Sequence, residues 1–183
     1  MGAHGSFSEQ AGEEYLRVEG ISDGVIVPLV TAEAVLSAVE NGEVDRGIFP
    51  IENSNGGIVI EAVHAMAKHQ FTIERMFEID VHHNLLVLPG VIASEVTEIT
   101  SHDQAIKQCR MYLKRVWPDA DISVYKDTAA AAAALHDGTL PRTTAVIAPK
   151  RCATLYELEI LEPSIQDLKF NFTTFLVAKR YEL

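Results

Sequence analysis

The chain has 183 residues, of which 48% are apolar and 22% charged, and these values are typical of a globular rather than a disordered protein. Its net charge of -11 argues against a nucleic-acid surface, so we expect no nucleic acid partner, and any anion site must be built from local groups. No run approaches the roughly 18 apolar residues that span a bilayer, and the N-terminus lacks a basic and apolar signal. We therefore expect a cytoplasmic protein without membrane contact.

The first motif lies at residues 5–11, where a helix is expected to open and Ser6 stands three residues before Glu9. This is the spacing of a capping box, in which both side chains satisfy free backbone N–H groups at a helix start. A glycine beside a helix start can also expose N–H groups that hold a carboxylate. Taken alone, the motif fits either a helix cap or a ligand site.

The following segments alternate between helical and extended patterns. Thr31 precedes a helix predicted over residues 32–40, and Gly42 lies just beyond its end as a C-cap. After it the sequence predicts a buried strand at 47–51, a helix at 58–68, an extended segment at 71–79 and a strand at 85–89. This rhythm of strand and helix indicates an α/β fold with largely parallel sheets.

Polar side chains directly follow the strand predicted at 47–51. Glu52, Asn53, Ser54 and Asn55 precede a glycine pair. In open α/β sheets ligands gather at the carboxyl ends of strands, where such side chains converge. A plain turn would explain the asparagines and glycines but has no need of the glutamate. We therefore predict a functional site in this segment.

From Ser101 the pattern of the first half starts again. Residues 102–105 echo residues 8–11, and further echoes link 137–138 with 41–42 and 146–149 with 48–50. The offset drifts between roughly 94 and 99 residues, so either an internal duplication or ordinary cap and strand chemistry explains the matches. Two similar lobes are the resulting working interpretation.

The stretch from Ser101 to Gln104 poses the same choice as the first motif. A serine cap with a glutamine three residues later is one interpretation. The other is an anion site to which His102 donates.

The remaining segments mostly favour structure over chemistry. Residues 129–134 are all alanine, the best helix former, and Asp127 or Thr128 is expected to cap that helix. Cys109 and Cys152 have no partner at ligand spacing and are expected to be buried, inert thiols. Residues 175–178 predict a final strand that can return to the first lobe.

Taken in chain order, several segments resemble the motifs of the prephenate dehydratase family. The family patterns Gly-Thr/Ser-Phe-Ser, Pro-x-Glu-Asn-Ser and Ser-His-x-Gln-Ala are matched by residues 5–8, 50–54 and 101–105. An Asp-x-Thr/Ala-rich helix start is matched at 127–130, and an Ile-Gln-Asp at 165–167. The final signature, Asn-x-Thr-Arg-Phe, is matched at 171–175 except that Thr174 replaces the arginine. The likeness covers nearly the whole chain.

The resemblance implies an α/β fold of two similar lobes around a cleft, like the type 2 periplasmic binding proteins, with no metal and no organic cofactor. Lobe 1 would comprise residues 1–77 and 168–183, and lobe 2 residues 78–167. The implied reaction converts prephenate, a small-molecule substrate, into phenylpyruvate with loss of water and carbon dioxide in phenylalanine biosynthesis. The implied assembly is a homodimer or a higher homo-oligomer.

The resemblance also implies roles for individual residues. Thr173 would hydrogen-bond or protonate the departing ring hydroxyl, with Glu52 as a second catalytic residue. The residues implied to contact the carboxylates and ring of the substrate are Ser6, Phe7, Asn53, Ser54, Ser101, His102, Gln104, Thr128, Ala129, Asn171, Thr174 and Phe175.

The chain departs from the family pattern in three respects. Thr174 cannot clamp a carboxylate as an arginine fork does. Either the activity is altered, or the arginine is structural, or its part is taken by Arg142, Arg151 or Lys169. The apolar strand that usually precedes the glycine motif is not seen ahead of Gly5, and its loss from the first sheet would be severe. A phenylalanine-sensing ACT domain is not expected from this sequence.

Two other functions stay open at this level. A prephenate decarboxylase would keep the ring hydroxyl and release a non-aromatic keto acid. A binding or sensing protein would hold a small aromatic acid without turnover. The retained Thr173 favours dehydration.

Overall fold

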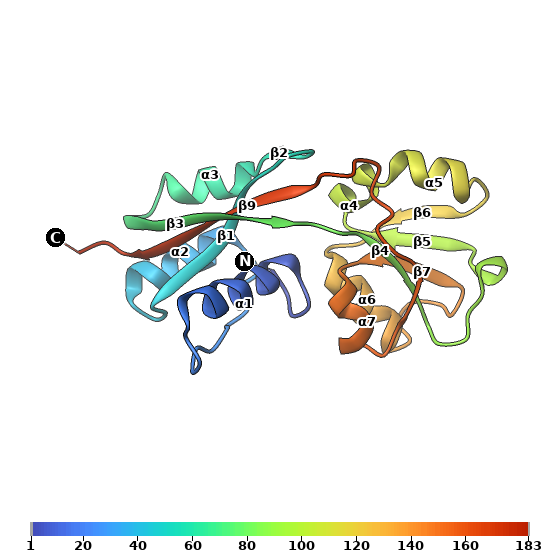
Figure 1. The fold of residues 1–183 in the computed structure, drawn as a ribbon, viewed down its shortest axis with the longest axis horizontal. Coiled ribbons are helices and arrows are strands. Elements are labelled where there is room, and N and C mark those ends of the chain that lie inside the picture. The colour runs from blue at the N-terminus through green and yellow to red at the C-terminus, as the bar shows by residue number, and fades with distance from the viewer. Residues whose placement is uncertain (1, 183) are drawn as a thin grey trace. The chain divides into compact units, whose positions relative to one another are not determined.

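The computed structural model describes residues 2–182, which divide into two compact units. Unit 1 consists of residues 2–3, 7–80 and 172–182, and unit 2 consists of His4–Ser6 and Val81–Asn171. The chain therefore passes between the units after Asp80 and again before Phe172. Figure 1 shows the elements of each unit in chain order.

In the four-stranded sheet of unit 1, one of the two inner strands comes from the end of the chain. Its order is β2 (Gly57–Ile58), β1 (Arg46–Asn53), β9 (Phe172–Arg180) and β3 (Phe71–Asp80), and every neighbouring pair is antiparallel. The predicted largely parallel sheets are wrong for this unit. The reason is that β9 enters from the far end of the sequence and runs against both neighbours, an arrangement that the local rhythm of strand and helix does not reveal.

Helices cover both faces of the unit 1 sheet. Helices α2 (Ala32–Asn41) and α3 (Ile60–Met66) pack on the face that includes Phe49, Leu176 and Ala178. Helix α1 (Phe7–Glu19) packs on the other face, where Ala11 meets Ile79 and Phe175. Because strand side chains alternate between faces, neighbouring residues of β9 belong to different cores.

The ends of α2 follow the signals in the sequence. Thr31 Oγ1 accepts a hydrogen bond of 3.1 Å from the backbone N–H of Ala34, which satisfies one of the free donors at the helix start. Gly42 ends the helix in the left-handed region, at φ 73°, where a side chain would be strained. The predicted cap and stop are both confirmed.

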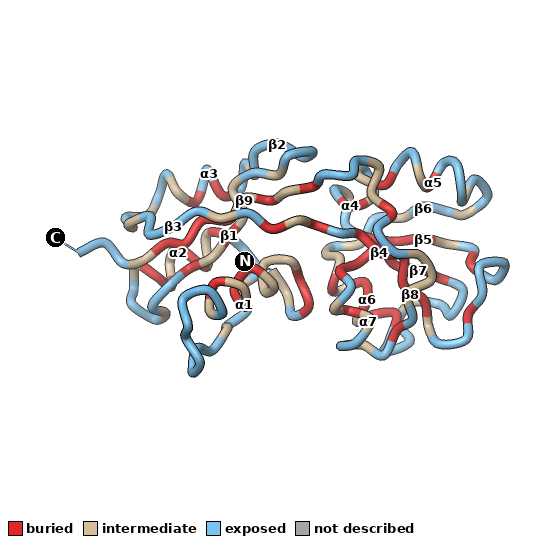
Figure 2. Tube along the Cα trace, viewed as in Figure 1, coloured by how far each residue is buried: buried red, intermediate tan, exposed pale blue. Residues whose placement is uncertain are grey.

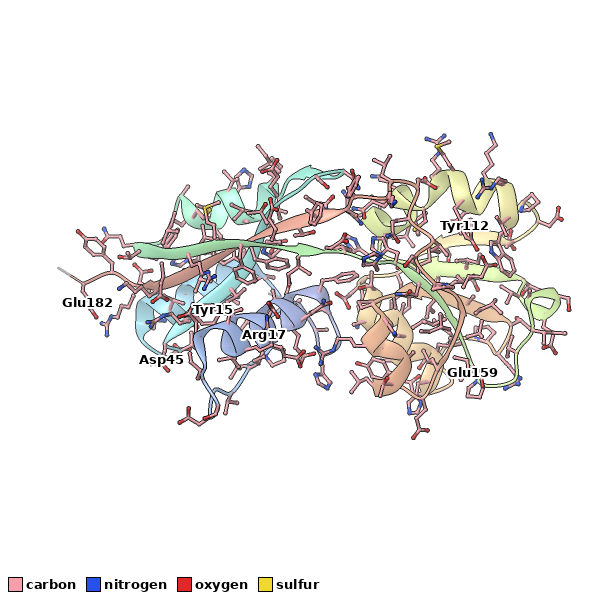
Figure 3. The ribbon with its side chains drawn as sticks, in the orientation of Figure 1. Tyr15, Arg17, Asp45, Tyr112, Glu159 and Glu182 are labelled. Carbon is pink, nitrogen blue, oxygen red and sulfur yellow. The ribbon has the colours of Figure 1, made fainter. Side chains whose placement is uncertain are left out.

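Helix α1 is tied to the sheet by a polar contact at its far end. The hydroxyl of Tyr15 donates to Glu74 on β3 at 3.2 Å, and Arg46 at the start of β1 pairs with the same carboxylate. Arg46 holds the pKa of Glu74 below its usual range through the hydrogen bond between them. Figure 3 shows Tyr15 among the side chains of this helix. The contact fixes the roll of α1 on the sheet.

The sheet of unit 2 is mixed. Its order is β6 (Asp121–Val124), β5 (Glu98–Ser101), β7 (Thr144–Ala148), β4 (Asn84–Val87) and β8 (Glu159–Glu162). The first three strands are parallel, whereas β4 runs antiparallel to both β7 and β8. The prediction of parallel pairing therefore holds for half of this sheet. A 3-10 turn, η1 (Ala93–Glu95), leads into β5.

Two helical layers sandwich this mixed sheet. Helices α4 (Asp103–Gln108) and α5 (Arg110–Val116) share a core with Ala145 and Ile147 of β7. Helices α6 (Thr128–His136) and α7 (Lys150–Leu155) share the other core with Val146 and Ala148. All five residues of β7 are buried, as Figure 2 shows along its trace. A strand covered on both faces reads as a continuous apolar run.

Unit 1 contains a cavity beside α1, in a region where the order of its elements can be compared with that of unit 2. In unit 2, β5 lies between β6 and β7, ahead of α4. The segment 21–29 follows α1 in unit 1, just as β6 follows α5 in unit 2. In the same way, β1 follows α2 in unit 1 and β7 follows α6 in unit 2. A cavity of about 520 Å³ is lined by that segment, α1 and the start of β1. Among residues 2–182 no strand precedes α1, and Val25 on this segment is 85% exposed.

Candidate functional site

The first group of candidate residues lies in unit 1, where the end of β1 meets the beginning of β9. Asn53 and Ile79 flank Thr173 in the strand register. The side-chain Nδ2 of Asn53 donates a hydrogen bond of 2.8 Å to Oγ1 of Thr173. Thr173 is 9% exposed. The register therefore brings the predicted catalytic threonine against one predicted contact residue, Asn53.

The turn after β1 holds the start of β9. Ser54 N–H donates to Phe172 O at 2.8 Å, and Phe172 N–H donates back to Ser54 Oγ at 3.0 Å. Asn53 Oδ1 accepts from the N–H groups of Asn55 and Gly56 at 2.9 and 2.8 Å. The polar segment predicted as a functional site thus includes a hydrogen-bonded turn whose side chains brace the strand that carries Thr173.

Thr174 and Thr173 leave β9 on opposite faces of the sheet. Thr174 is paired directly with Glu52 of β1 and Glu78 of β3, in the row next to that of Thr173. Side chains directly across a sheet share a face, and successive residues do not. An arginine at position 174 would therefore sit between two exposed carboxylates rather than beside the hydroxyl of Thr173. This geometry supports the interpretation that the family arginine is structural.

Glu52, the second predicted catalytic residue, also leaves the sheet on the face of Thr174. Its register partner is Thr174, and a bulge between Pro50 and Glu52 keeps it on that face. The structure therefore does not bring its carboxylate together with the Thr173 hydroxyl. Its catalytic role stays a prediction.

Phe175 belongs to the core under α1. It is 1% exposed, and its ring stacks with that of Phe77 at a centroid distance of 6.1 Å. Ala11 of α1 packs against it. Phe7, the first residue of α1, is only half-buried. Of the two predicted aromatic contacts, Phe7 is the more accessible to a ligand.

The second group lies in unit 2, at the carboxyl edge of its parallel strands. Ser101 ends β5 and is fully buried, and its hydroxyl donates to Ile147 O at 2.6 Å. The backbone N–H of Gln104 donates to His102 Nδ1 at 3.3 Å. His102, not Ser101, is therefore the N-cap of α4, and the predicted serine cap is wrong. The serine is unable to cap because its hydroxyl already bridges β5 and β7.

The segment His4–Ser6 lies against α6 and α7 in unit 2. Cys152 Sγ donates to Gly5 O at 3.4 Å, and the hydroxyl of Tyr156 donates to His4 O at 3.0 Å. A Cβ on Gly5 would stand 3.5 Å from Cβ of Ala129, at the start of α6. Gly5 of the first sequence motif and Ala129 of the motif at 127–130 are thus neighbours in unit 2. Ser6, next to Gly5, is buried.

The start of α6 has the cap that the sequence predicts. Asp127 Oδ1 accepts from the N–H of Ala130 at 2.8 Å, so Asp127 is the N-cap and Thr128 the first helical residue. Thr128 is half-buried, whereas Ala129 is fully buried. Of this pair, Thr128 is the residue with a side chain available for contact.

Asn171 is fully buried in a polar network of unit 2. Its Nδ2 donates to Val81 O at 3.1 Å and to Gln108 Oε1 at 2.8 Å. Nε2 of His83 lies 2.8 Å from the same Gln108 oxygen. Burial lowers the pKa of His83 to about 4, so the ring is neutral near pH 7 and Nε2 carries its proton. Asn171, predicted to contact substrate, has the environment of a structural residue.

Gln108 and His83 are members of this network that the sequence did not single out. Gln108 sits at the end of α4 and His83 just before β4, and neither belongs to a motif. The place of Asn171 as the first residue of the final signature gave a signal for Asn171 itself but none for these partners.

Both cysteines behave as expected of core thiols. Cys109 and Cys152 are buried and free. Burial raises the pKa of the Cys109 thiol well above its usual range, which keeps it protonated and unreactive. Cys152 lies in α7, and Cys109 joins α4 to α5. The prediction of structural thiols is confirmed.

Two further features concern metal binding and membranes. Within residues 2–182, no three His, Cys, Asp or Glu side chains gather as metal ligands would. No helix in the same range is both long and apolar enough to cross a bilayer.

The chain matches the prephenate dehydratase family over residues 1–182. The chain belongs to this family. The predicted resemblance to this family is therefore confirmed.

Curated relatives share the whole chain but extend well beyond it. Arogenate dehydratase 5, chloroplastic, of Arabidopsis thaliana is 38% identical over 181 residues, which cover 98% of this chain and 41% of the relative. The bifunctional chorismate mutase/prephenate dehydratase of Pseudomonas aeruginosa is 30% identical over 183 residues, covering 100% of this chain and 48% of the relative. The chain spans less than half the length of these relatives.

Solved structures confirm the α/β fold of the family. A prephenate dehydratase from Arthrobacter aurescens in complex with L-Phe superposes with a TM-score of 0.89 at 30% identity, over 100% of this chain and 60% of that one. GqqA, described as a novel type of quorum quenching acylase, superposes with a TM-score of 0.80 at 25% identity, over 100% of this chain and 63% of that one. The same fold thus accompanies two differently described activities, so side chains must decide the reaction.

Proposed function

We propose that this chain is a carbon–oxygen lyase that converts prephenate to phenylpyruvate, carbon dioxide and water, in the formation of phenylalanine. The observation that carries the proposal is the hydrogen bond of 2.8 Å from Asn53 to Thr173, which holds this hydroxyl of the final signature at the end of β1. Family membership over residues 1–182 supports it.

The reaction needs one proton, which is taken up by the ring hydroxyl as it leaves. The ring carboxylate leaves as carbon dioxide, and the electron pair of its bond moves through the ring to complete the aromatic system. The hydroxyl on the opposite ring carbon departs with its own bonding pair and takes up a proton to become water. Thr173 would donate that proton or a hydrogen bond to the leaving oxygen, and solvent would restore the threonine. A positioned donor of this kind typically contributes ~10² to 10⁴-fold.

Substrate carboxylates must be held by local groups, because the chain carries a net charge of -11. The side chains that support this role in unit 2 are Ser6, His102, Gln104 and Thr128, whereas the hydroxyl of Ser101 already donates to Ile147 O. The N–H groups at the start of α6 lie beside Gly5, and a helix N-terminus favours an anion. We assign carboxylate recognition to this group.

Arogenate is a second candidate substrate. It has an amino group where prephenate has a keto group, so the same loss of water and carbon dioxide gives phenylalanine directly. The relatives named arogenate dehydratases, at 35 to 38% identity, are closer to this chain than the bacterial bifunctional prephenate enzymes at 30%. The chemistry assigned to Thr173 is the same for both.

One experiment separates these possibilities. The purified chain is incubated with prephenate and with arogenate in parallel near pH 7.5, and products are identified by mass spectrometry against an enzyme-free control. Phenylpyruvate above the control rate supports the proposal, and phenylalanine from arogenate supports the second candidate. Thr173→Ala should lower the rate of formation of either product by ~10² to 10⁴-fold.

Other outcomes of the same experiment would overturn the proposal. A non-aromatic keto acid that keeps the hydroxyl would show a decarboxylase. Prephenate recovered unchanged but bound in calorimetry would show a binding protein. Absence of turnover and of binding would leave the family fold without the family reaction, as the acylase description of one structural neighbour illustrates.

We also propose that the protein acts in the cytoplasm as a homodimer or higher homo-oligomer. The compartment is a proposal in its own right, since the names of several Arabidopsis relatives place those proteins in chloroplasts. The assembly is proposed from family resemblance. Cell fractionation and light scattering coupled to size-exclusion chromatography test the two statements separately.

A further inference from the structure

The side chain of Asn53 has its orientation set by the turn that follows β1. Its Oδ1 accepts two backbone hydrogen bonds, from Asn55 N–H at 2.9 Å and from Gly56 N–H at 2.8 Å. Only a carbonyl oxygen can accept from these N–H groups, so the amide nitrogen must point the other way. The network therefore assigns the amide without ambiguity, and the nitrogen faces Thr173.

This orientation decides the direction of the bond to Thr173. An amide nitrogen only donates, so Oγ1 of Thr173 is the acceptor in the contact of 2.8 Å. The hydroxyl hydrogen of Thr173 is then not used in this bond. Among residues 2–182, no group accepts a hydrogen bond from this hydroxyl. Donation into the oxygen also polarises the O–H bond, because hydrogen bonds in a chain strengthen one another.

Ser54 controls the backbone that carries the same hydroxyl. Its N–H and Oγ make reciprocal bonds of 2.8 and 3.0 Å with the O and N–H of Phe172, the residue before Thr173. Together with the register pair of Asn53 and Thr173, these bonds hold the start of β9 against the end of β1. The position of Thr173 and the direction of its hydroxyl are therefore set by consecutive residues of one turn.

We infer that Asn53 and Ser54 are positioning residues that hold the Thr173 hydroxyl as a proton donor, rather than residues that contact the substrate as the family resemblance implied. The inference rests on the proposed lyase function of Thr173. Asn53 acts through its amide by occupying the acceptor side of Oγ1, and Ser54 acts through the backbone of Phe172.

The decisive variant is Asn53→Asp, which is isosteric. One carboxylate oxygen can still accept from the N–H groups of Asn55 and Gly56, so the turn is retained. The other oxygen only accepts, so it must take the hydrogen of Thr173 and reverse the bond. We expect kcat to fall by about 10²-fold with KM unchanged, because only an interaction of the transition state is lost.

The pH profile gives a second reading of the same variant. Protonation of the introduced carboxyl restores a donor, so the activity of Asn53→Asp should rise as the pH falls towards 5, after the enzyme-free rate is subtracted. The matched control is Asn41→Asp, in which the exchanged amide contacts Glu43 at the surface. This control should keep the activity and pH profile of the unaltered protein.

A double-substitution cycle tests whether Asn53 acts through Thr173. In a Thr173→Ala background, Asn53→Asp should cause no further loss of residual activity, whereas an independent contact with substrate would lower it again. A rise in KM at constant kcat in Asn53→Asp would also overturn the inference, since it would show substrate binding by Asn53.

Ser54→Ala keeps the inference testable if Asn53→Asp fails to fold by circular dichroism. It removes the bond to Phe172 N–H and retains the bond to Phe172 O, so we expect a loss of kcat of about tenfold at constant KM. An unchanged kcat would contradict the inference. If the unaltered protein turns over neither substrate, the proposed function fails first; if it is active and these variants are too, only the positioning role fails.

Discussion

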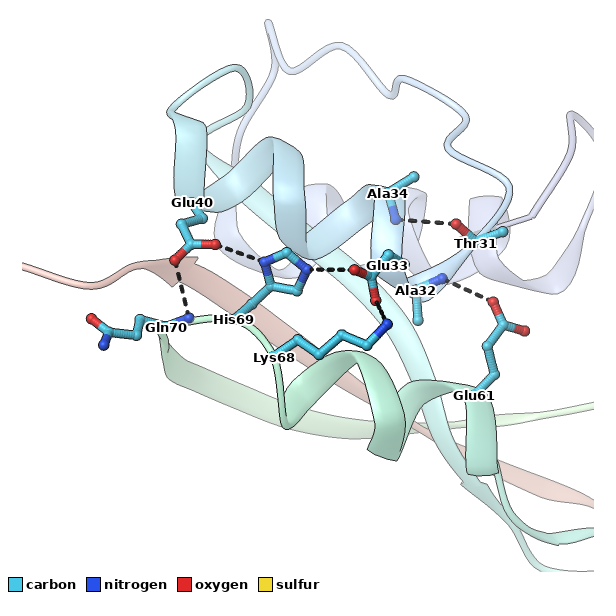
Figure 4. Close-up of polar contacts among 9 residues, drawn as sticks. All are labelled: Thr31, Ala32, Glu33, Ala34, Glu40, Glu61, Lys68, His69 and Gln70. Atoms are coloured by element: carbon cyan, nitrogen blue, oxygen red, sulfur yellow. Dashed lines mark hydrogen bonds and ion pairs between the residues drawn. The ribbon is translucent and has the colours of Figure 1, made fainter.

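His69 Nδ1 lies 2.6 Å from Oε2 of Glu40, which places a half-buried imidazole beside a carboxylate of α2 (Figure 4). Its Nε2 lies 3.1 Å from Oε1 of Glu33 at the other end of the same helix. Lys68 also contacts Glu33, at 3.1 Å. The turn after α3 is therefore joined to both ends of α2 by charged groups, all within unit 1.

The stability of the protein should depend on the protonation of His69. The hydrogen bond to Glu40 raises the pKa of His69 above its ordinary value, and the bond to Glu33 acts in the same direction. A raised histidine pKa stabilises the fold fully below the unfolded value of about 6.5. We therefore expect this contribution to be lost as the pH rises above about 6.5 through the folded pKa of His69.

The measurement is urea unfolding of the unaltered protein and of His69→Gln between pH 5.5 and 8.5. The difference in unfolding free energy should shrink as the pH rises. His64→Gln serves as the control, because His64 is another histidine of the same region. A difference that stays constant with pH would contradict the role of His69 protonation.

His83 should give the opposite dependence on pH. Burial lowers its pKa to about 4, with the neighbouring His82 adding a smaller effect of the same sign. The unfolded chain takes up a proton near pH 6.5 while the folded chain does not, so stability falls as the pH drops from about 6.5 to 4. A shift of this size corresponds to roughly 3 kcal/mol.

The substitution His83→Gln keeps a donor for Gln108 and removes the titration. The unfolding free energy of this variant should change less between pH 6.5 and 4 than that of the unaltered protein. Equal slopes for the two proteins would show that His83 does not titrate in this range.

Asn171→Ala should destabilise the fold strongly. The change leaves Val81 O without the side-chain donor of Asn171 and removes one of the donors to Gln108 Oε1 in a fully buried setting. Each buried bond lost in this way costs about 1 to 3 kcal/mol, so we expect a total of roughly 2 to 6 kcal/mol in urea unfolding. Asn41→Ala, at an exposed site, should stay within about 0.5 kcal/mol of the unaltered protein. Equal effects of the two variants would argue against the network.

Thr174→Arg should change stability rather than catalysis. The new side chain would stand directly across from Glu52 and Glu78, on the face of β9 opposite to Thr173. Opposite charges at such positions contribute roughly 0.2 to 1 kcal/mol, which thermal unfolding can detect. Because the guanidinium lies away from the Thr173 hydroxyl, kcat should stay unchanged.

A matched control for this variant is Thr72→Arg. Thr72 pairs across the same sheet with Lys179, so the added positive charge should give no gain or a small loss of stability. A tenfold rise in kcat for Thr174→Arg would show that the arginine takes part in the reaction and that the alternation of faces does not exclude it.

Local signals in the sequence predicted local structure well. The cap at Thr31, the stop at Gly42 and the cap at Asp127 are confirmed because each depends on a few consecutive residues. The serine cap at Ser101 failed because the serine hydroxyl is taken by Ile147, a residue on another strand. Caps are thus predictable until a tertiary contact competes for the same side chain.

The candidate site shows the same division. The order of short motifs identified the family and singled out Thr173. From the motifs alone, the residues predicted to contact the substrate include Asn53, Ser54, Asn171 and Thr174. A sequence motif does not show in which direction each of its side chains points. The structure separates them, because alternate strand residues point to opposite faces and because Asn171 is enclosed in a polar network.

The sequence by itself determined the family, the α/β class and the residue that carries the proposed chemistry. These follow from the order of short motifs and from the hydrophobic periodicity, both of which can be recognised in short stretches of sequence. Only the tertiary structure decided that the Asn53 amide meets the Thr173 hydroxyl, across 120 positions of the chain. That contact depends on β9 returning from the chain end to lie antiparallel beside β1, and strand register over such a distance leaves no local pattern in the sequence.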